Sequence, residues 1–261
     1  GKIKGIIVNS GSANCCVGYQ GLIDSRDIAT KCKEIFNSKE PFLMSSTGVI
    51  GVEIPVGLIM NSIEKFNLDS NGGEKFSRAI ITTDSKTKNV SVNVNSKNGS
   101  YKIGGVAKGS GMIHPKMGTM LSYITTDAGL NSEDLTSLLR KSVENSFNQI
   151  DVDGDTSTND TVVVMANGKS GINLNTADEI NEFKEALDYV TKFLAKQIAE
   201  DGEGISHLIT VEVNGAKNDK DALSVSNAVV SSSLVKTAIF GKDPNWGRIM
   251  MAIGNADAEI I

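Results

Sequence analysis

The sequence predicts a layered sandwich that mixes α-helices with β-strands, of the α/β or α+β class. Short apolar runs that suit strands occur among longer segments whose apolar residues recur every three or four positions, as in amphipathic helices. These segments do not follow the strict strand–helix–strand rhythm of a doubly wound parallel sheet. The 261 residues, 39% of them hydrophobic, are enough for a sizeable core, and no linker or internal repeat divides the chain.

Several segments before residue 104 carry one of these two patterns. We expect strands at 3–9, 79–84, 88–94 and 101–103, and helices at 25–36 and 56–66. The turn at 95–99 would join the strands on either side of it into a hairpin. Residues 44–55 contain many small side chains and are expected to form a loop that enters an apolar segment.

The second half of the chain is expected to hold longer helices and single strands. One helix is predicted over 133–147 and another over 177–198, where Thr176 and Glu179 have the spacing of a capping box. Strands are expected at 162–165 and 208–213.

The stretch from Gly104 to Asp127 joins a glycine-rich segment to an alternating apolar run. The glycines let the backbone bend, so a glycine-rich loop is predicted to lead into a strand at 120–125. Thr119 would lie at the junction of loop and strand. Gly118 before it leaves room for attack on the carbonyl that joins the two residues.

Thr119 is a candidate nucleophile, although a threonine hydroxyl is weak until a base activates it. If the chain is cut before Thr119, the new α-amine can act as that base, with an ordinary pKa of about 7.7–8.0. A threonine on a half-buried strand is far more often structural. The pattern alone therefore leaves both interpretations open.

Composition argues against several other classes of function. The net charge is −5 and the lysines are scattered, so no basic face for nucleic acid is expected. No apolar run approaches about 20 residues, so no membrane span is expected. The cysteines, Cys15, Cys16 and Cys32, are odd in number and favour a reducing, cytoplasmic compartment over a disulfide framework. The two histidines, His114 and His207, are too few for a His-rich metal site.

Some short motifs resemble ligand sites without matching them. Residues 104–110 resemble a phosphate-binding loop, but that loop needs a lysine and then a hydroxyl residue after its second glycine, and here Ser110 follows Gly109 directly. Residues 151–161 begin like a calcium loop, but Thr156 and Val162 stand where that loop needs Gly and Glu. An acidic turn, solvated or ordering a site through hydrogen bonds, is the better interpretation. The two adjacent cysteines are expected to be buried by packing rather than to act as nucleophiles.

Several blocks of sequence, taken together, carry a stronger signal. They are NSGSANCCVGYQG (9–21), SSTGVIGVEIP (45–55), ITTDSKTK (81–88), AKGSGMIHPKMGTML (107–121), SFNQIDVDGDTSTNDTVVVMANG (146–168), DGEG (201–204) and LVKTAIFGKDPNWGRI (234–249). In this order they resemble the ornithine acetyltransferase family, the bifunctional glutamate N-acetyltransferases (amino-acid acetyltransferases) of arginine biosynthesis. The resemblance covers nearly the whole chain and implies the family's self-processing, N-terminal-nucleophile-like fold.

This resemblance implies that the precursor cuts itself between Gly118 and Thr119. The products would be an α chain (1–118) and a β chain (119–261) that together form one catalytic unit. Thr119 would take the acetyl group from N-acetylornithine as an ester and pass it to glutamate.

The resemblance also assigns roles to residues outside the cleavage segment. Thr47 and Gly48 match the family's oxyanion-hole pair. Lys108 and Glu203 match binding residues for the substrate carboxylate and amino groups. Thr82 matches a further substrate-binding position, although the register between Thr82 and Thr83 stays open.

Acetyl exchange between two amino acids implies no metal and no organic cofactor, and whether acetyl-CoA also donates acetyl groups is left open. The family implies α and β chains that assemble further, as α2β2 or higher. Its members also have additional chain before the 9–21 block and after the 234–249 block. This sequence is therefore expected to lack the N- and C-terminal segments, including residues that complete the substrate site. His114, Lys116 and Gly118 depart from the residues usual before the family's cut.

Two alternatives to acetyl transfer remain. A related N-terminal-nucleophile amidohydrolase or aminopeptidase would use water as the acceptor. An unprocessed, non-catalytic fragment would use the family-like loops only to hold its fold.

Overall fold

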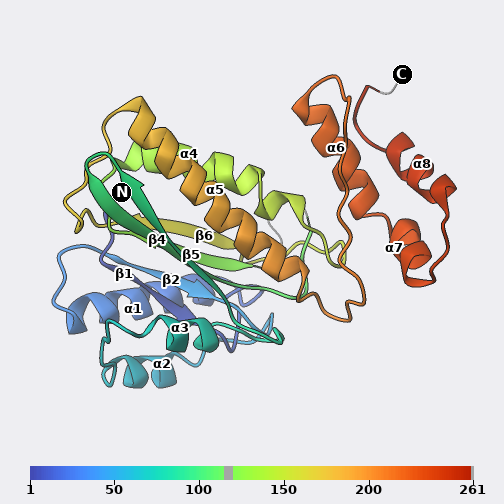
Figure 1. The fold of residues 1–261 in the computed structure, drawn as a ribbon. Helices are drawn as coiled ribbons and strands as arrows, with labels where there is room; N and C mark the ends of the chain where they lie inside the picture. The colour runs from blue at the N-terminus through green and yellow to red at the C-terminus, as the bar shows by residue number, and fades with distance from the viewer. Residues whose placement is uncertain (115–119, 260–261) are drawn as a thin grey trace.

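The chain is layered around two β-sheets that pack on each other, with helices on the outer side of each (Figure 1). The computed structural model of the protein describes residues 1–114 and 120–259. Its layers of helices and strands confirm the predicted fold class. Gly118 and Thr119, the proposed cleavage site, lie outside the described residues.

The smaller sheet and its helices come from the first part of the chain. In order they are β1 (Gly5–Asn9), α1 (Gln20–Ile35), β2 (Phe42–Ser46), α2 (Val56–Ile63) and α3 (Gly73–Ala79). The two strands are parallel. Ile28 and Cys32 of α1 are buried in a cluster with Ile7 of β1 and Ile63 of α2. The apolar face predicted for α1 therefore covers this sheet.

The larger sheet has four strands in the order β3-β4-β5-β6. Their bounds are β3 (Lys88–Ser96), β4 (Gly99–Lys108), β5 (Leu121–Thr126) and β6 (Thr161–Ala166). The strands β3, β4 and β5 are antiparallel in turn, whereas β5 and β6 are parallel. Lys108, the last residue of β4, pairs with Leu121, the first residue of β5. The segment that contains Thr119 thus connects two neighbouring strands.

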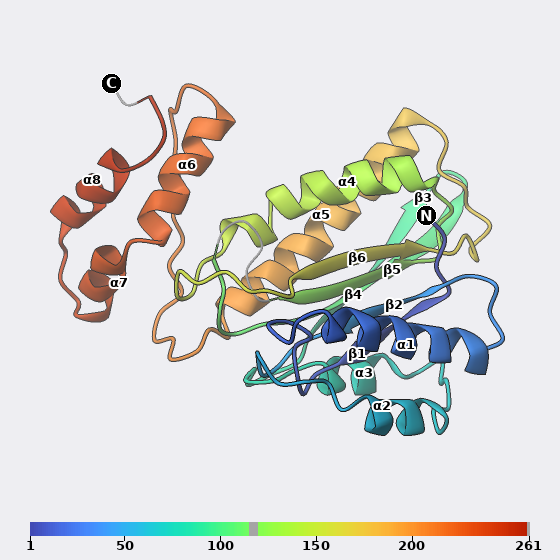
Figure 2. The same cartoon turned by 180° about the vertical axis from the view of Figure 1, so that it is seen from behind.

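Helices α4 (Ser132–Glu144) and α5 (Ala177–Ala199) cover the face of the larger sheet that points away from the smaller one (Figure 2). Thr176 and Glu179 form the predicted capping box at the start of α5. The buried face of α5 contributes Phe183, Leu187, Val190, Leu194 and Ile198 to the main core, together with Tyr101, Ile103 and Ile124 of the sheet.

A second apolar layer lies between the two sheets. Leu121 and Tyr123 of β5 are buried there, with Ile6 and Val8 of β1 packed against them. Ile80, directly after α3, completes this layer. Because residues of β5 alternate between the two layers, the strand is enclosed on both faces.

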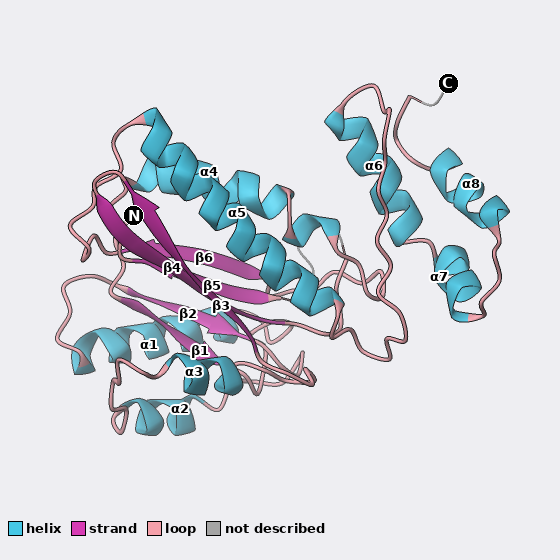
Figure 3. Ribbon diagram, in the orientation of Figure 1, coloured by secondary structure: helices cyan, strands magenta, loops and turns pink. Residues whose placement is uncertain are grey.

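The C-terminal part forms a separate group of helices beyond one end of the sheets (Figures 1 and 3). They are α6 (Asp219–Val230), α7 (Ser233–Phe240) and α8 (Trp246–Gly254), and they bury Val229, Val235 and Ala252. Among the described residues no single helix has the length and apolarity to cross a membrane. The bent pair α6–α7 meets that test by length and composition only.

The strand predicted at 79–84 is wrong. Residue 79 ends α3 and the following residues are irregular. Asp84 accepts a hydrogen bond from the backbone N–H of Thr82, two residues before it, and this local bond replaces strand pairing. Residues 208–213 alternate but form no strand either, because Val211 packs on the C-terminal helix cluster instead of in a sheet.

Two predicted loops contain strand residues. Residues 104–108 belong to β4, so the irregular part of the glycine-rich segment begins only at residue 109. Residues 44–46 belong to β2. The expectation that Cys15 and Cys16 are buried is also wrong, since Cys15 is half-buried and Cys16 is exposed.

The glycines of β4 explain how α5 approaches the sheet, and they give a first prediction. A Cβ at Gly105 would lie 2.9 Å from both Val190 and Leu194, which are fully buried, whereas a Cβ at Gly104 meets nothing closer than 3.8 Å. We expect Gly105→Ala to lower the free energy of unfolding by about 1–3 kcal/mol through overpacking. Denaturant titration measures the effect, and Gly104→Ala is the matched control. Equal stability of the two variants would contradict this packing.

Candidate active site

A cavity of about 640 Å³ lies where several connecting segments meet at one end of the strands. Its walls come from the residues after β1 and β2, the segment before β3, and the end of β4. The lining residues are Ser10, Gly11, Thr47, Gly48, Val49, Ile81, Thr82, Thr83, Lys108, Ser110, Gly111, Met112, Asp153 and Glu203. Because the carboxyl ends of parallel strands open at one edge of a sheet, β1 and β2 deliver their following turns side by side.

The turn after β2 presents Thr47 and Gly48 to this cavity. The backbone N–H of Thr47 donates to the carbonyl of Asn9 at 2.9 Å, which ties the turn to the end of β1. Gly48 has a φ of +124°, and a Cβ there would overlap the carbonyl of Gly11. Only glycine fits this position. No described residue accepts a hydrogen bond from the Gly48 N–H.

Lys108 brings a buried positive charge to the same place. Lys108 is the last residue of β4 and is 2% exposed. The ammonium donates to Thr47 Oγ1 at 2.9 Å and to Thr82 Oγ1 at 3.1 Å. Burial lowers the pKa of Lys108 below its ordinary value. Among the described residues that line the cavity, Lys108 is the cationic one.

Thr83 and Glu203 form a second polar group of the cavity wall. The Thr83 hydroxyl donates to the Glu203 carboxylate and lies 2.8 Å from Ser110 Oγ. The backbone N–H of Glu203 donates to the carbonyl of Ser110 at 2.8 Å. A Cβ at Gly111 would overlap the carboxylate, so the glycine is needed for this approach. Thr82 and Thr83 thus both reach the cavity, one toward Lys108 and one toward Glu203.

A buried ion pair network holds these segments in place. Lys88, at the start of β3, has a fully buried side chain and lies 2.6 Å from both the Asp84 and Asp201 carboxylates. Asp84 also accepts hydrogen bonds from the backbone N–H of Gly109 at 2.7 Å and of Thr82 at 3.2 Å. Asp201, two residues before Glu203, also accepts from Ser85. The network therefore fixes the backbone around each polar group of the cavity.

The electrostatics of this network follow from its hydrogen bonds. Burial by itself raises the pKa of Asp84, but the bonds from Lys88 and from the Gly109 N–H outweigh it, and the pKa is lower than usual. The same balance of burial against Lys88 and Ser85 lowers the pKa of Asp201. Both carboxylates therefore stay charged to below their ordinary range.

Asp160 lies beside the first described residue after the proposed cut. Its Oδ1 accepts a hydrogen bond from the Met120 N–H at 2.9 Å. Burial raises the pKa of Asp160 to about 6, although the bond from Met120 and the charge of Lys108 act in the opposite direction. Thr119, the residue before Met120, is outside the described part of the chain.

The acidic turn at 151–161 orders the neighbouring loop through hydrogen bonds. Asp153 accepts from the backbone N–H groups of Met112 and Ile113. In residues 1–114 and 120–259, no three His, Cys, Asp or Glu side chains group so as to hold a metal ion. The turn thus anchors one wall of the cavity, as one of the sequence interpretations proposed.

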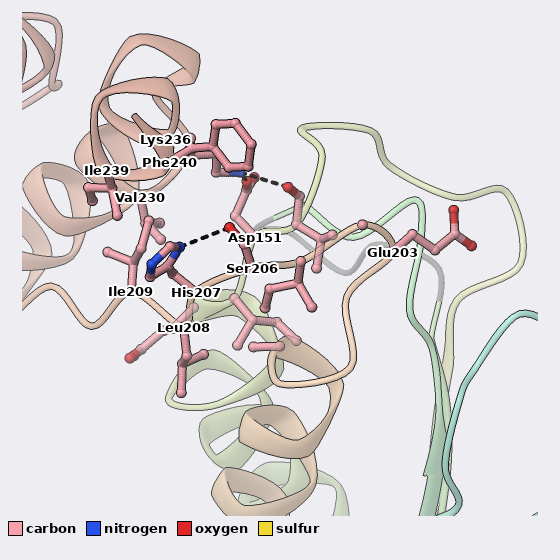
Figure 4. Close-up of a pocket in the computed structure, with 16 residues that line it drawn as sticks. Asp151, Glu203, Ser206, His207, Leu208, Ile209, Val230, Lys236, Ile239 and Phe240 are labelled. Atoms are coloured by element: carbon pink, nitrogen blue, oxygen red, sulfur yellow. Dashed lines mark hydrogen bonds and ion pairs between the residues drawn. The ribbon is translucent and has the colours of Figure 1, made fainter. Parts of the chain in front are cut away.

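A second, smaller pocket of about 250 Å³ lies between this turn and the C-terminal helices (Figure 4). Asp151, whose side chain is fully buried, binds Lys236 of α7 and lies 2.7 Å from His114 Nδ1. Figure 4 shows the Glu203 carboxylate directed away from Asp151, Lys236 and His207. The Glu203 carboxylate therefore forms part of the larger cavity, where it accepts a hydrogen bond from Thr83.

The structure brings most of the predicted site residues into one cavity: Thr47, Gly48, Thr82, Lys108 and Glu203. Gly118 and Thr119 lie outside the described residues. Sequence reasoning left the choice between Thr82 and Thr83 open, and it did not single out Ser110 or the Asp84–Lys88–Asp201 network as parts of the site. Asp84 and Lys88 lie in the family-like block 81–88, and Asp201 lies in the block DGEG. The blocks therefore marked these residues, but nothing in the sequence indicated that they pair with one another.

Two sheets enclosed by helices, with the candidate site at the ends of the strands, place the protein among layered folds of the N-terminal-nucleophile type. The chain belongs to the ArgJ family, which it matches over residues 1–261. A solved structure, the arginine biosynthesis bifunctional protein ArgJ from Bacillus halodurans, is similar with a TM-score of 0.52 and 51% identity. That similarity covers 55% of this chain and 68% of the other.

Curated relatives are similar over nearly the full length of the chain. A glutamate N-acetyltransferase from Methanocaldococcus jannaschii is 46% identical over 264 residues, covering 99% of this chain and 65% of the relative. An arginine biosynthesis bifunctional protein ArgJ from Streptococcus thermophilus is also 46% identical, covering 100% of this chain and 66% of the relative. The chain thus spans just under two thirds of the length of these relatives.

The buried network gives a prediction about stability. Replacing Lys88 with methionine leaves the Asp84 and Asp201 carboxylates buried without their shared cation, which typically costs about 3–5 kcal/mol. We expect Lys88→Met to lower the free energy of unfolding at pH 7 by this amount. Lys86→Met, which removes an exposed ammonium 3.7 Å from Glu200, should change it by less than about 0.5 kcal/mol.

The same prediction has a defined pH dependence. Because the folded pKa values of Asp84 and Asp201 are lowered, their contribution is present above the unfolded pKa of about 3.9 and is lost as pH falls through the folded values. The deficit of Lys88→Met should therefore shrink in acid, where protonation removes the unpaired charges. A deficit that is independent of pH would mean that lost packing, not charge, destabilises the variant.

Proposed function

We propose that the protein is a glutamate N-acetyltransferase that moves an acetyl group from N-acetylornithine to glutamate in arginine biosynthesis. The names of the curated relatives support acetyl transfer to glutamate and a place in arginine biosynthesis, whereas N-acetylornithine as the donor rests on the family resemblance. The observation that carries the proposal is the cavity in which Lys108 contacts both Thr47 and Thr82, with Glu203 on the same wall. It combines donors for a developing oxyanion with one positive and one negative group, as an amino-acid substrate requires.

The proposed reaction begins with self-cleavage. The Thr119 hydroxyl attacks the Gly118 carbonyl carbon, the peptide C–N bond breaks to leave an ester and a free α-amine, and water hydrolyses the ester. The products are an α chain (1–118) that ends in a carboxylate and a β chain (119–261) whose Thr119 hydroxyl is restored. The α-amine of Thr119 then takes the proton of its own hydroxyl. The hydroxyl oxygen attacks the acetyl carbonyl of N-acetylornithine, the amide C–N bond breaks, and ornithine leaves with the proton. Glutamate's amine next attacks the acetyl ester, which releases N-acetylglutamate and restores the Thr119 hydroxyl.

The described residues supply binding and charge stabilisation in this scheme. The Thr47 hydroxyl and the Gly48 N–H would donate to the oxyanion, and one such donor contributes about 3–4 kcal/mol to lowering the barrier. The third N–H of Lys108 would bind the substrate carboxylate, while Glu203 would bind its amino group. Thr82 would help to orient the substrate through Lys108. The same site serves donor and acceptor in turn, as a ping-pong reaction requires.

The proposal extends to the setting of the enzyme. We infer that it needs no metal or organic cofactor, and that acetyl-CoA is a candidate second acetyl donor. We further infer a cytoplasmic enzyme whose α and β chains remain together and assemble as α2β2 or higher. Size-exclusion chromatography with light scattering measures that assembly state, and competition between acetyl-CoA and N-acetylornithine tests the second donor.

Intact-mass analysis tests the proposed processing. We expect two chains, residues 1–118 and 119–261, and a single uncut chain for Thr119→Ala, because alanine lacks the hydroxyl that attacks the Gly118 carbonyl. Thr136→Ala, on the exposed face of α4, is the control and should be processed normally. A wild-type protein that stays uncut would favour the non-catalytic alternative.

Product analysis tests the reaction itself. With N-acetylornithine and glutamate we expect N-acetylglutamate, and Thr47→Ala should lower kcat by about 10²- to 10³-fold because one oxyanion donor is lost. Thr47→Ser keeps the hydroxyl and should keep most of the activity. Release of free acetate without N-acetylglutamate would instead identify a hydrolase with water as the acceptor.

A further inference from the structure

The contact between Lys108 and Thr47 has a direction that bears on the oxyanion hole. An ammonium can only donate, so in its 2.9 Å contact with Lys108 the Thr47 oxygen must accept. The hydroxyl proton of Thr47 is then left to donate elsewhere. The same holds for Thr82, whose oxygen accepts from Lys108 at 3.1 Å.

We propose that Lys108 is a positioning residue of the oxyanion hole, which orients the Thr47 hydroxyl and strengthens it as a hydrogen-bond donor. This role rests on the proposed acetyl transfer and deepens it, because the family resemblance assigns Lys108 only to binding of the substrate carboxylate. Two of the three Lys108 N–H groups serve the threonines, and the third remains for a carboxylate. The two roles are therefore compatible and can be measured separately.

The backbone on both sides holds this contact rigidly. The Thr47 N–H is tied to Asn9 at the end of β1. Lys108 ends β4 in register with Leu121 of β5, and the N–H of the next residue, Gly109, is bound by Asp84. Thr47 is 3% exposed and Lys108 2%. Both side chains are therefore almost fully buried where they meet.

The charge of Lys108 is not cancelled by a direct ion pair. Among the described residues, no carboxylate lies within 4.0 Å of its ammonium. Its polar contacts are the two hydroxyls, so the positive charge polarises them rather than a carboxylate. A hydroxyl that accepts a hydrogen bond from a cation donates more strongly, and a buried charge is effective where negative charge develops.

The protonation state of Lys108 decides the direction of the contact. The ionisable groups that act on it are Asp84, Lys88, Asp160 and Glu203. Burial lowers the pKa of Lys108, Lys88 acts in the same direction, and the three carboxylates oppose them without reversing the shift. A neutral amine would accept from Thr47 and turn the hydroxyl proton away from the oxyanion. Acylation should therefore weaken as pH rises through the pKa of Lys108.

An acetyl donor without a carboxylate separates the two roles of Lys108. The probe is p-nitrophenyl acetate. Intact mass measures the acetylation of Thr119, and absorbance measures the release of p-nitrophenol. We expect Lys108→Met to slow acetylation by at least about tenfold, as for partial loss of one oxyanion donor. The double variant with Thr47→Ala should be no slower than Thr47→Ala alone. Lys102→Met, the same change at an exposed site of β4, is the control and should acetylate at the wild-type rate.

Lys108→Arg keeps a permanent charge and tests the role of protonation. It should restore part of the acetylation rate and lack the fall at alkaline pH that the wild type shows. This variant also answers the case in which Lys108→Met does not fold or process, which circular dichroism and intact mass reveal. If the acetylation rate of Lys108→Arg falls at the same alkaline pH as that of the wild type, the proposal is overturned.

The remaining outcomes also decide the question. If p-nitrophenyl acetate acetylates Lys108→Met at the wild-type rate while the KM of this variant for N-acetylornithine is raised, Lys108 serves only to bind the carboxylate. Losses that multiply in the double variant would show that Lys108 acts independently of Thr47. If the wild type itself gains no acetyl group on Thr119, the proposed function fails first and this role fails with it.

Discussion

The site depends on one buried cation, Lys88, which holds two carboxylates together in the interior. Asp84 extends this hold to the backbone at Thr82 and Gly109, and Asp201 extends it to the DGEG segment. These segments also carry side chains that line the cavity: Thr82 itself, Lys108 directly before Gly109, and Glu203 within DGEG. Because Lys88 has no solvent to replace its partners, a change at this point would move Thr82, Lys108 and Glu203 together.

Lys88 and Lys108 show how one sheet uses the same residue type in two ways. Both lysines are buried, but Lys88 is neutralised by two carboxylates while Lys108 contacts only hydroxyls. A paired lysine contributes fixed geometry, whereas an unpaired one leaves its positive charge available to a substrate. The Asp84 carboxylate connects them, because it pairs with the Lys88 ammonium and also accepts a hydrogen bond from the backbone N–H of Gly109, the residue after Lys108.

The fold class, the long helices and the hairpin could be predicted from the sequence, because α1, α5 and the β3–β4 pair carry clear periodicity and α5 has a capping box. The start of α1 at Gln20 was predicted five residues too late, because no side chain caps this helix. Family-like blocks also pointed to Thr47, Gly48, Lys108 and Glu203. Residues 79–84 and 208–213 were predicted wrongly, because alternation cannot show whether a partner strand exists. Lys88 and Asp201 were missed because they are 113 positions apart, and no local pattern records such a contact.

The pairing of β4 with β5 gives a proposed cut between Gly118 and Thr119 an uncommon thermodynamic consequence. The two strands exchange their hydrogen bonds over 103–108 and 121–126, and a cut in the connection between them would remove none of these. The protein would then have folded as one chain but would have to refold as two. Closing a short loop is an intramolecular step, whereas the association of two fragments depends on concentration. Processing would thus make the native state persist through the slowness of its unfolding rather than through easy reassembly.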